Sequence, residues 1–174
     1  LDFLQRISPQ TKSMLLATAT PIQLHPVEAW DLLDALSRGS DAVLGSAGSP
    51  WRNARRAVEM AMGATDLPTD EVEMWEWVRN PLPPAAEGKD FELFRRILRL
   101  PDTAAFAPGS RFDDLGAPGK ARLRHGFKTF IEQSNPFIRG IVLRTRDYLE
   151  TTINPETGEP FLKPVKVRLY GESD

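Results

Sequence analysis

The sequence predicts a mainly α-helical protein with few short strands. Apolar side chains recur at three- and four-residue intervals in six stretches of the 174 residues, whereas clear alternation of apolar and polar side chains is confined to a stretch near the C-terminus. Proline, glycine and capping residues separate the helical stretches from one another. Because 41% of the residues are hydrophobic, the chain can bury a core of its own, and wholesale disorder is excluded.

The N-terminal part is predicted to hold two helices and one strand. The apolar residues of positions 1–7 share one helix face. Residues 14–17 form a short apolar run that is typical of a buried strand. A proline suits the first turn of the next predicted helix, over residues 26–36. The small and polar residues 39–48 are expected to form a loop.

Three further helices are predicted over residues 50–62, 70–80 and 90–100. Ser49 and Thr69 are expected to cap the first two, because a side-chain hydroxyl can accept a hydrogen bond from a free backbone N–H of the first turn. Prolines that follow the second and the third stretch end both helices.

The longest predicted helix runs from residue 118 to about 134, after a loop rich in proline and glycine. A short helix over 136–141 is expected to follow it. Residues 154–158 have the composition of a turn, and residues 165–169 alternate like a strand. The buried face of the longest helix is predicted to consist of Leu123, Phe127, Phe130 and Ile131.

The composition excludes several classes of function. Without cysteine the chain has no thiolate chemistry, zinc finger or disulfide framework. Its two histidines, His25 and His125, are too few for a histidine-based metal site. The four tryptophans lie at helical spacings and are expected in the core rather than on a base-stacking surface. Since no apolar run approaches the ~18 residues of a membrane span, and no secretory signal is present, we expect a cytoplasmic protein that contacts no membrane.

Charge is distributed unevenly along the chain. Residues 66–90 carry seven acidic side chains against two basic ones, whereas residues 120–149 carry seven basic side chains against two acidic ones. Such asymmetry predicts one acidic and one basic surface element, and the basic one could face an anionic partner. The simpler alternative is that both stretches are solvated helix surfaces.

One segment resembles a phosphate-binding loop only superficially. Gly119 and Lys120 are followed by Ala121, which has no hydroxyl to bind Mg²⁺, and Asp114 stands where the first glycine of such a loop belongs. The start of a helix explains the segment better, because Pro118 suits the first helical position. No catalytic residue is assigned in this chain.

The most informative segment lies between the predicted strand and the helix that follows it. Residues 18–23 read Thr-Ala-Thr-Pro-Ile-Gln, and residues 28–33 read Glu-Ala-Trp-Asp-Leu-Leu. This pattern resembles the third motif of superfamily-two helicases, and specifically that of the Swi/Snf-type ATP-dependent DNA translocases. Leu24 departs from the family, in which many members carry asparagine, and this difference indicates a divergent, bacterial branch.

A second resemblance lies farther along the chain. Residues 135–139 read Asn-Pro-Phe-Ile-Arg, and residues 141–146 read Ile-Val-Leu-Arg-Thr-Arg. This run is similar to the segment that precedes the second lobe of the same translocases. Members of the family commonly insert a helical protrusion between the two motifs. The resemblance implies that the stretches 14–36 and 135–146 lie together in the fold.

The resemblance also implies a division into three segments. Residues 1–38 would be the C-terminal part of a first RecA-like α/β lobe, and residues 39–134 a helical insertion. Residues 135–174 would be a linker that leads to the second RecA-like lobe. The expected architecture is therefore a helical insertion attached to a remnant of a RecA-like lobe.

The implied function belongs to the intact protein, which would hydrolyse ATP with Mg²⁺ and move along double-stranded DNA. One group of residues would couple the nucleotide state to DNA: Thr18, Ala19, Thr20, Pro21 and Gln23. A second group would face nucleic acid or the lobe junction: Arg139, Arg144, Thr145 and Arg146.

The resemblance places this chain after the phosphate loop and the Asp-Glu metal box of the family and before its arginine finger. The first residue, Leu1, also indicates a piece of a longer protein. We therefore expect the isolated chain to bind neither ATP nor Mg²⁺ and to be catalytically inactive.

A non-catalytic helical module remains the competing hypothesis. In that case the acidic stretch 66–90 and the tryptophans of the helical insertion would dock a protein partner. The residues encoded upstream of Leu1 distinguish the two hypotheses, because only a translocase would carry a phosphate loop and an acidic metal box there.

Overall fold

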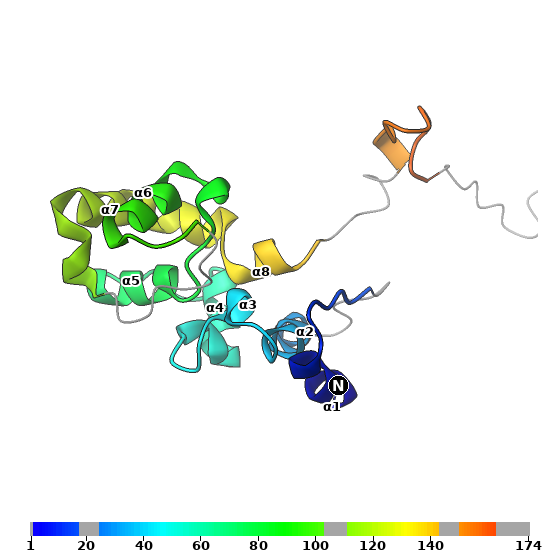
Figure 1. The fold of residues 1–174 in the computed structure, drawn as a ribbon, viewed down its shortest axis with the longest axis horizontal. Coiled ribbons are helices and arrows are strands. Elements are labelled where there is room, and N and C mark those ends of the chain that lie inside the picture. The colour runs from blue at the N-terminus through cyan, green and yellow to red at the C-terminus, as the bar shows by residue number, and fades with distance from the viewer. Residues whose placement is uncertain (1, 18–24, 103–110, 143–149, 163–174) are drawn as a thin grey trace, which may run out of the picture. The chain divides into compact units, whose positions relative to one another are not determined.

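The computed structural model is mainly helical, as the sequence predicts (Figure 1). It describes residues 2–17, 25–102, 111–142 and 150–162. Among these residues the β pairing is limited to one isolated bridge, between Ile153 and Pro160. The chain divides into two compact units, residues 1–141 and 142–174, and each is described by itself.

The described residues of the first unit form eight α-helices and four short 3₁₀ turns. The 3₁₀ turns are η1 (Ser8–Gln10), η2 (Pro50–Arg52), η3 (Ala85–Glu87) and η4 (Phe112–Leu115). The α-helices are α1 (Asp2–Ile7), α2 (Val27–Ser37), α3 (Asp41–Leu44), α4 (Ala54–Ala61), α5 (Glu71–Arg79), α6 (Lys89–Leu98), α7 (Gly116–Gln133) and α8 (Pro136–Gly140).

The hydrophobic core of the first unit is built around aromatic side chains. Trp51, Trp75 and Trp77 are at most 1% exposed, which confirms their prediction as core residues. The indole rings of Trp51 and Trp77 meet edge to face, with their centroids 4.6 Å apart. The predicted stripe of α7 is also buried, because its four residues are at most 5% exposed: Leu123, Phe127, Phe130 and Ile131.

Two helices begin differently from the prediction, because polar side chains cap them at other residues. The Asn53 side chain accepts a hydrogen bond from the backbone N–H of Arg56, so Asn53 separates η2 from α4, and the single helix predicted over 50–62 is wrong. Asp70 caps α5 in place of Thr69, because its carboxylate accepts from two backbone N–H groups of the first turn. A carboxylate also complements the positive end of the helix dipole, which favours aspartate as the cap.

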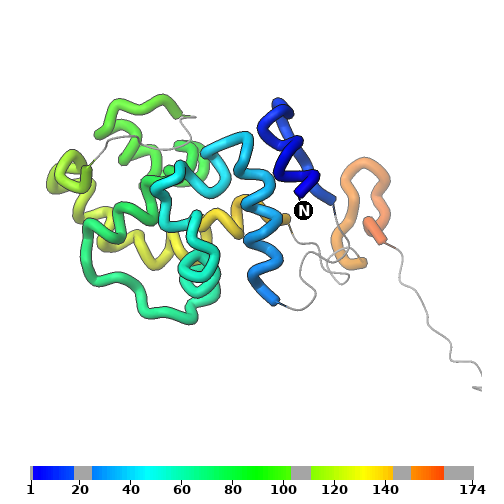
Figure 2. Tube along the Cα trace, turned by 90° about the horizontal axis from the view of Figure 1, so that it is seen from below, coloured from blue at the N-terminus to red at the C-terminus, as the bar shows by residue number. Residues whose placement is uncertain are grey.

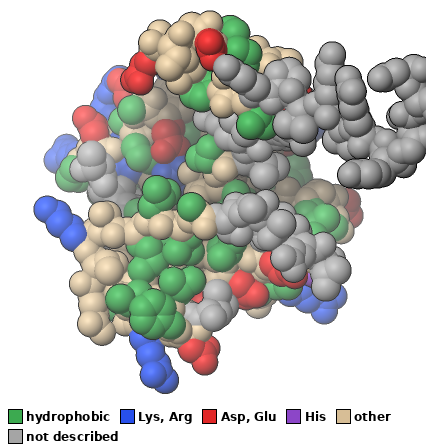
Figure 3. Space-filling model, turned by 90° about the vertical axis from the view of Figure 1, so that its right-hand side faces the viewer, with side chains coloured by type: hydrophobic (Ala, Val, Ile, Leu, Met, Phe, Trp, Pro, Cys, Tyr) green, Lys and Arg blue, Asp and Glu red, His purple; other side chains and the backbone are tan. Residues whose placement is uncertain are grey.

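The predicted strand at residues 14–17 is wrong. These residues form neither a strand nor a helix, and the Leu15 side chain is 93% exposed. Phe3 in α1 is also largely exposed. Figure 3 shows a group of hydrophobic side chains on one face of the molecule. An apolar run of four residues does not show whether a partner strand exists, and here the described residues offer none.

The predicted loop at residues 39–48 contains a helix that the sequence pattern missed. The Ser40 hydroxyl accepts from the backbone N–H of Ala42 and starts α3, and Gly45, with a φ of 79°, ends it. Leu44 is fully buried in the core cluster. A single helical turn is too short to show an apolar period, which explains why the composition suggested a loop.

The described part of the second unit contains the turn predicted at residues 154–158. The Asn154 side chain accepts from the backbone N–H of Glu156, and the Gly158 N–H donates to the Asn154 carbonyl, 2.9 Å in each case. The strand predicted at 165–169 lies outside the described residues. In the described ranges, none of the helices has the length and apolar character that a membrane crossing requires.

Three glycines offer a matched test of the fold. A Cβ at Gly45 would combine a φ of 79° with a contact of 2.6 Å to the Asn80 carbonyl oxygen. A Cβ at Gly63 would have no neighbouring atom within 4 Å, although the φ there is 65°. A Cβ at Gly48 would also have no neighbour within 4 Å, and Gly48 has no positive φ. We predict that Gly45→Ala costs about 3 kcal/mol of unfolding free energy, Gly63→Ala about 1 kcal/mol, and Gly48→Ala less than about 0.5 kcal/mol.

Urea denaturation of the three variants measures these differences. If Gly45→Ala is no more destabilising than Gly63→Ala, the close approach of Gly45 to Asn80 is wrong.

Candidate functional site

The residues predicted to carry function fall in two groups. The coupling segment 18–23 and the arginine run 144–146 lie outside the described residues. Arg139 and the two helices that flank these segments, α2 and α8, are described, and they define the candidate site.

Helix α2 begins directly after the predicted coupling segment. The backbone N–H of Val27 donates to Nδ1 of His25, 3.2 Å away, and the N–H of Glu28 donates to the His25 carbonyl, 3.0 Å away. His25 therefore helps to start α2. Residues 18–23 precede the first turn of this helix by only a few residues in the sequence.

Helices α2 and α8 pack against each other (Figure 2). Leu33 of α2 is fully buried, and a Cβ added at Gly140 of α8 would lie 2.6 Å from its Cδ2 atom. The absence of a side chain at Gly140 allows this close approach. The two segments that carry the family resemblance thus lead into and out of neighbouring helices.

A buried carboxylate fixes the C-terminal end of α2. Asp34 is 4% exposed, and its Oδ2 accepts from Arg38 at 2.7 Å and from Gln5 of α1 at 3.2 Å. The guanidinium of Arg52 lies 3.8 Å from the other oxygen of Asp34. A buried carboxylate with several donors stabilises the fold only as a complete set, since a lost donor leaves a charge away from water.

Arg52 connects α2 to the helices that follow it. Its guanidinium donates to the Ser37 hydroxyl at 2.6 Å and to the Gly45 carbonyl at 2.7 Å. Burial lowers the pKa of Arg52, and the nearby carboxylates of Asp34 and Asp41 oppose this effect. Arg52 therefore ties the end of α2 to η2 and to the turn after α3. Sequence reasoning did not single it out, because its partners are mainly backbone carbonyls and hydroxyls.

The acidic and basic stretches face each other in the structure. Arg122 pairs with Asp90, Arg124 with Glu71 at 2.7 Å, and Arg139 with Glu87 at 2.5 Å. Each of these three arginines is therefore engaged by a carboxylate of the same chain, and their part in binding an anionic partner stays a prediction. Arg139 is also only 18% exposed in its side chain.

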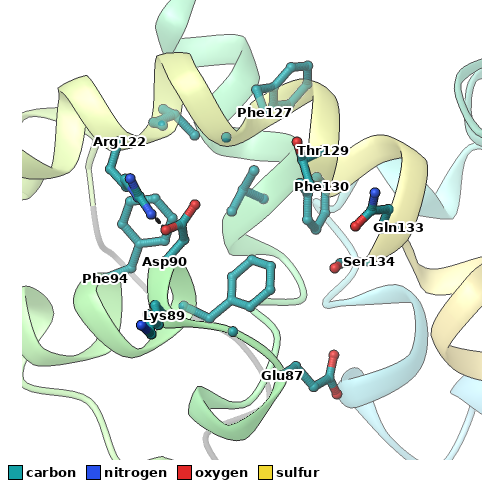
Figure 4. Close-up of a pocket in the computed structure, with 15 residues that line it drawn as sticks. Glu87, Lys89, Asp90, Phe94, Arg122, Phe127, Thr129, Phe130, Gln133 and Ser134 are labelled. Atoms are coloured by element: carbon teal, nitrogen blue, oxygen red, sulfur yellow. Dashed lines mark hydrogen bonds and ion pairs between the residues drawn. The ribbon is translucent and has the colours of Figure 1, made fainter.

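A second feature of the first unit is a hollow of about 250 Å³ between α6 and α7 (Figure 4). Two phenylalanines from each helix line it, and they are at most 7% exposed: Phe91, Phe94, Phe127 and Phe130. Gly126 of α7 lies beside it, and a Cβ there would be 2.7 Å from Oδ2 of Asp90. Sequence reasoning missed this hollow, although a glycine inside a helix is a signal of close approach.

No protein-family model, curated protein or solved structure matches the chain. In the described part of the chain, histidine, aspartate and glutamate side chains form no group of three that could hold a metal ion.

The ion pair of Glu87 and Arg139 can be measured by a double-mutant cycle. We predict that Glu87→Gln and Arg139→Gln, alone and together, give a coupling free energy of about 0.5–1 kcal/mol at low salt. The reason is that the Arg139 side chain is largely shielded from water. Chemical denaturation of the four proteins gives the coupling.

The matched control is the exposed pair of Lys128 and Glu132, whose side chains are 72% and 54% exposed and 3.6 Å apart. Its cycle is expected to give less than about 0.3 kcal/mol. Equal coupling in the two cycles would show that the shielding of Arg139 has no energetic effect.

Proposed function

We propose that this chain is the part of an ATP-dependent DNA translocase that connects two RecA-like lobes and carries a helical insertion. The observation that supports it best is the packing of α2 against α8. The Thr-Ala-Thr-Pro-Ile-Gln segment leads into α2, and α8 precedes the arginine run 144–146. A chain that couples a nucleotide-sensing segment to a nucleic-acid-binding one needs such a short route between them.

The residues of this chain would transmit a conformational change and would take no part in the chemical step of hydrolysis. In the intact protein, ATP with its Mg²⁺ would supply the free energy of hydrolysis. Thr18, Thr20 and Gln23 have hydroxyl and amide groups and precede α2 in the sequence, so a change in their hydrogen bonds would displace the helix. The displacement would pass to α8 through Leu33 and to η2 through Arg52.

The first test of this role is Thr20→Ala in the intact protein. We predict that the variant binds ATP as the wild type does but loses most of the stimulation of hydrolysis by DNA, because the lost hydroxyl removes one link to the nucleotide state. ATP affinity and ATPase rate, each with and without double-stranded DNA, are the measurements.

The matched control is Thr69→Ala, since Thr69 is an exposed threonine beside α5. It is expected to keep full stimulation by DNA. If Thr20→Ala keeps it as well, the coupling role of Thr20 is wrong.

The second test concerns the arginine run. Each phosphate that a protein neutralises contributes about 0.9 to the slope of log affinity against log salt. We predict that Arg144→Gln combined with Arg146→Gln in the intact protein lowers this slope by up to about 1.8. DNA binding measured at several salt concentrations gives the slope.

Arg55→Gln serves as the control, because the Arg55 side chain is 87% exposed and lies on α4. An unchanged slope in the double variant would assign Arg144 and Arg146 to packing instead of phosphate contact.

One observation favours the alternative, a helical protein-interaction module. A groove of about 530 Å³ lies between the α4–α5 connection and helices α7 and α8. Met62, Leu67 and Ile138 on its walls are 61%, 37% and 49% exposed. The three tryptophans of the helical insertion, which the sequence-based hypothesis named for this role, are buried and therefore not available for docking: Trp51, Trp75 and Trp77.

The sequence encoded upstream of Leu1 decides between the two proposals. A phosphate loop followed by an acidic metal box supports the translocase. Their absence supports the interaction module.

A further inference from the structure

The groove between the α4–α5 connection and helices α7 and α8 extends the hydrophobic core to the surface. Its volume of about 530 Å³ lies within the ~300–1,000 Å³ of pockets that bury most of a drug-sized ligand. Met60 and Ile131, which line it, are buried members of the core cluster. Met62 on one wall and Ile138 on the other are 61% and 49% exposed. An apolar occupant would remove these exposed side chains from water, which is favourable.

The backbone of both walls favours a helix over an extended peptide as the occupant. On one wall the N–H groups of residues 62–64 donate to carbonyl groups of α4. On the other wall the Asn135 Oδ1 atom accepts from the N–H groups of Phe137 and Ile138. An extended peptide needs backbone partners from the surface that binds it, and these N–H groups are already engaged. An α-helix satisfies its own backbone groups and needs only an apolar groove.

The end of the groove at the α4–α5 connection is acidic. Asp66 lines both the groove and a smaller hollow beside it, which Glu59 and Glu73 also line. Glu59 pairs with Arg55 at 2.8 Å, and Glu73 pairs with Arg56 at 2.9 Å. Among the residues that the structure describes, Asp66 has no ion-pair partner. A basic side chain of the occupant would therefore meet an unpaired carboxylate at this end.

We propose that this groove binds an amphipathic helix of a partner protein. Apolar side chains spaced by three and four residues would fill the groove, and a lysine or arginine at one end would lie beside Asp66. Met60 and Met62 suit this role, because a flexible thioether side chain adapts its shape to an occupant. The groove would bind the helix whether or not the intact protein hydrolyses ATP, so this inference goes beyond the proposed translocase function and is tested separately from it.

Selection from a displayed library of helical peptides, performed on the full 174-residue chain, tests the proposal. Each peptide has about 15 residues, because shorter isolated helices are only marginally stable, and one face is randomised among apolar, polar and charged residues. The wild type and Met62→Asp are screened in parallel, since a carboxylate in the groove should exclude an apolar helix face. We expect sequences with apolar residues at i, i+3 or i+4, and i+7, and a basic residue at one end, to be enriched on the wild type alone.

Two variants locate the bound peptide. Ile138→Asp is expected to weaken the binding of an enriched peptide at least about tenfold, because it removes apolar surface from one wall. Asp66→Asn is expected to weaken it about threefold at low salt. The same peptide with its basic residue replaced by glutamine should bind Asp66→Asn and the wild type equally well. Fluorescence anisotropy titrations measure these affinities.

Matched controls lie outside the groove. Val72→Asp introduces a carboxylate at an apolar residue of α5 that is 51% exposed, and Asp2→Asn removes one from an exposed residue of α1. Both variants should bind the peptide as the wild type does. Circular dichroism and urea denaturation establish that all the variants are folded.

Four results would overturn the proposal. The first is a library that yields no peptide with a higher affinity for the wild type than for Met62→Asp. The second is enrichment of acidic sequences, or of sequences without the helical spacing of apolar residues. The third is an affinity that either Ile138→Asp or Asp66→Asn leaves unchanged while the variant remains folded. The fourth is a concentration-dependent dimer of the chain that Ile138→Asp abolishes, which would assign the groove to a second copy.

Discussion

The burial of Trp51 is the constraint on which the rest of the first unit depends. Its indole N–H donates to the Trp77 carbonyl at 2.9 Å, and its own carbonyl accepts from the indole N–H of Trp30 at 2.9 Å. Its ring also lies 6.3 Å from that of Phe130 and 6.5 Å from that of Phe137. One fully buried residue thus joins α2, α5, α7 and α8. A large aromatic side chain with satisfied hydrogen bonds fixes both the spacing and the orientation of the helices around it.

This arrangement ties α2 to the helices that follow it in the chain. Trp30, Leu33 and Asp34 reach three different neighbours, and Arg52 closes the set from the other side. Because the contacts combine apolar packing with charged hydrogen bonds, α2 cannot shift alone without leaving a cavity or an unpaired charge. A displacement at its first turn would therefore be shared with α8, which is what the proposed coupling requires.

The sequence predicted the parts of the fold that local chemistry determines. The short helix after residue 135 and the buried stripe of α7 are as predicted, because helix-starting residues and periodic apolar residues act within one helix. The exposed run around Leu15 and the single turn of α3 were predicted wrongly, since four residues carry no period. The pairing of Arg139 with Glu87 could not be predicted, because the sequence shows that both charges exist but not that they meet. The hollow requires two helices that are distant in sequence, and only Gly126 hinted at their close approach.

The central claim is our proposal that the Thr-Ala-Thr-Pro-Ile-Gln segment and the arginine run belong to one ATP-driven motor that moves along DNA, with α2 and α8 as the contact between them. The structure describes the packing of α2 against α8. The most direct measurement is the ATPase rate of the protein encoded by the complete gene, with and without double-stranded DNA. The account predicts hydrolysis that increases when DNA is added. Hydrolysis no faster than background under both conditions would contradict it.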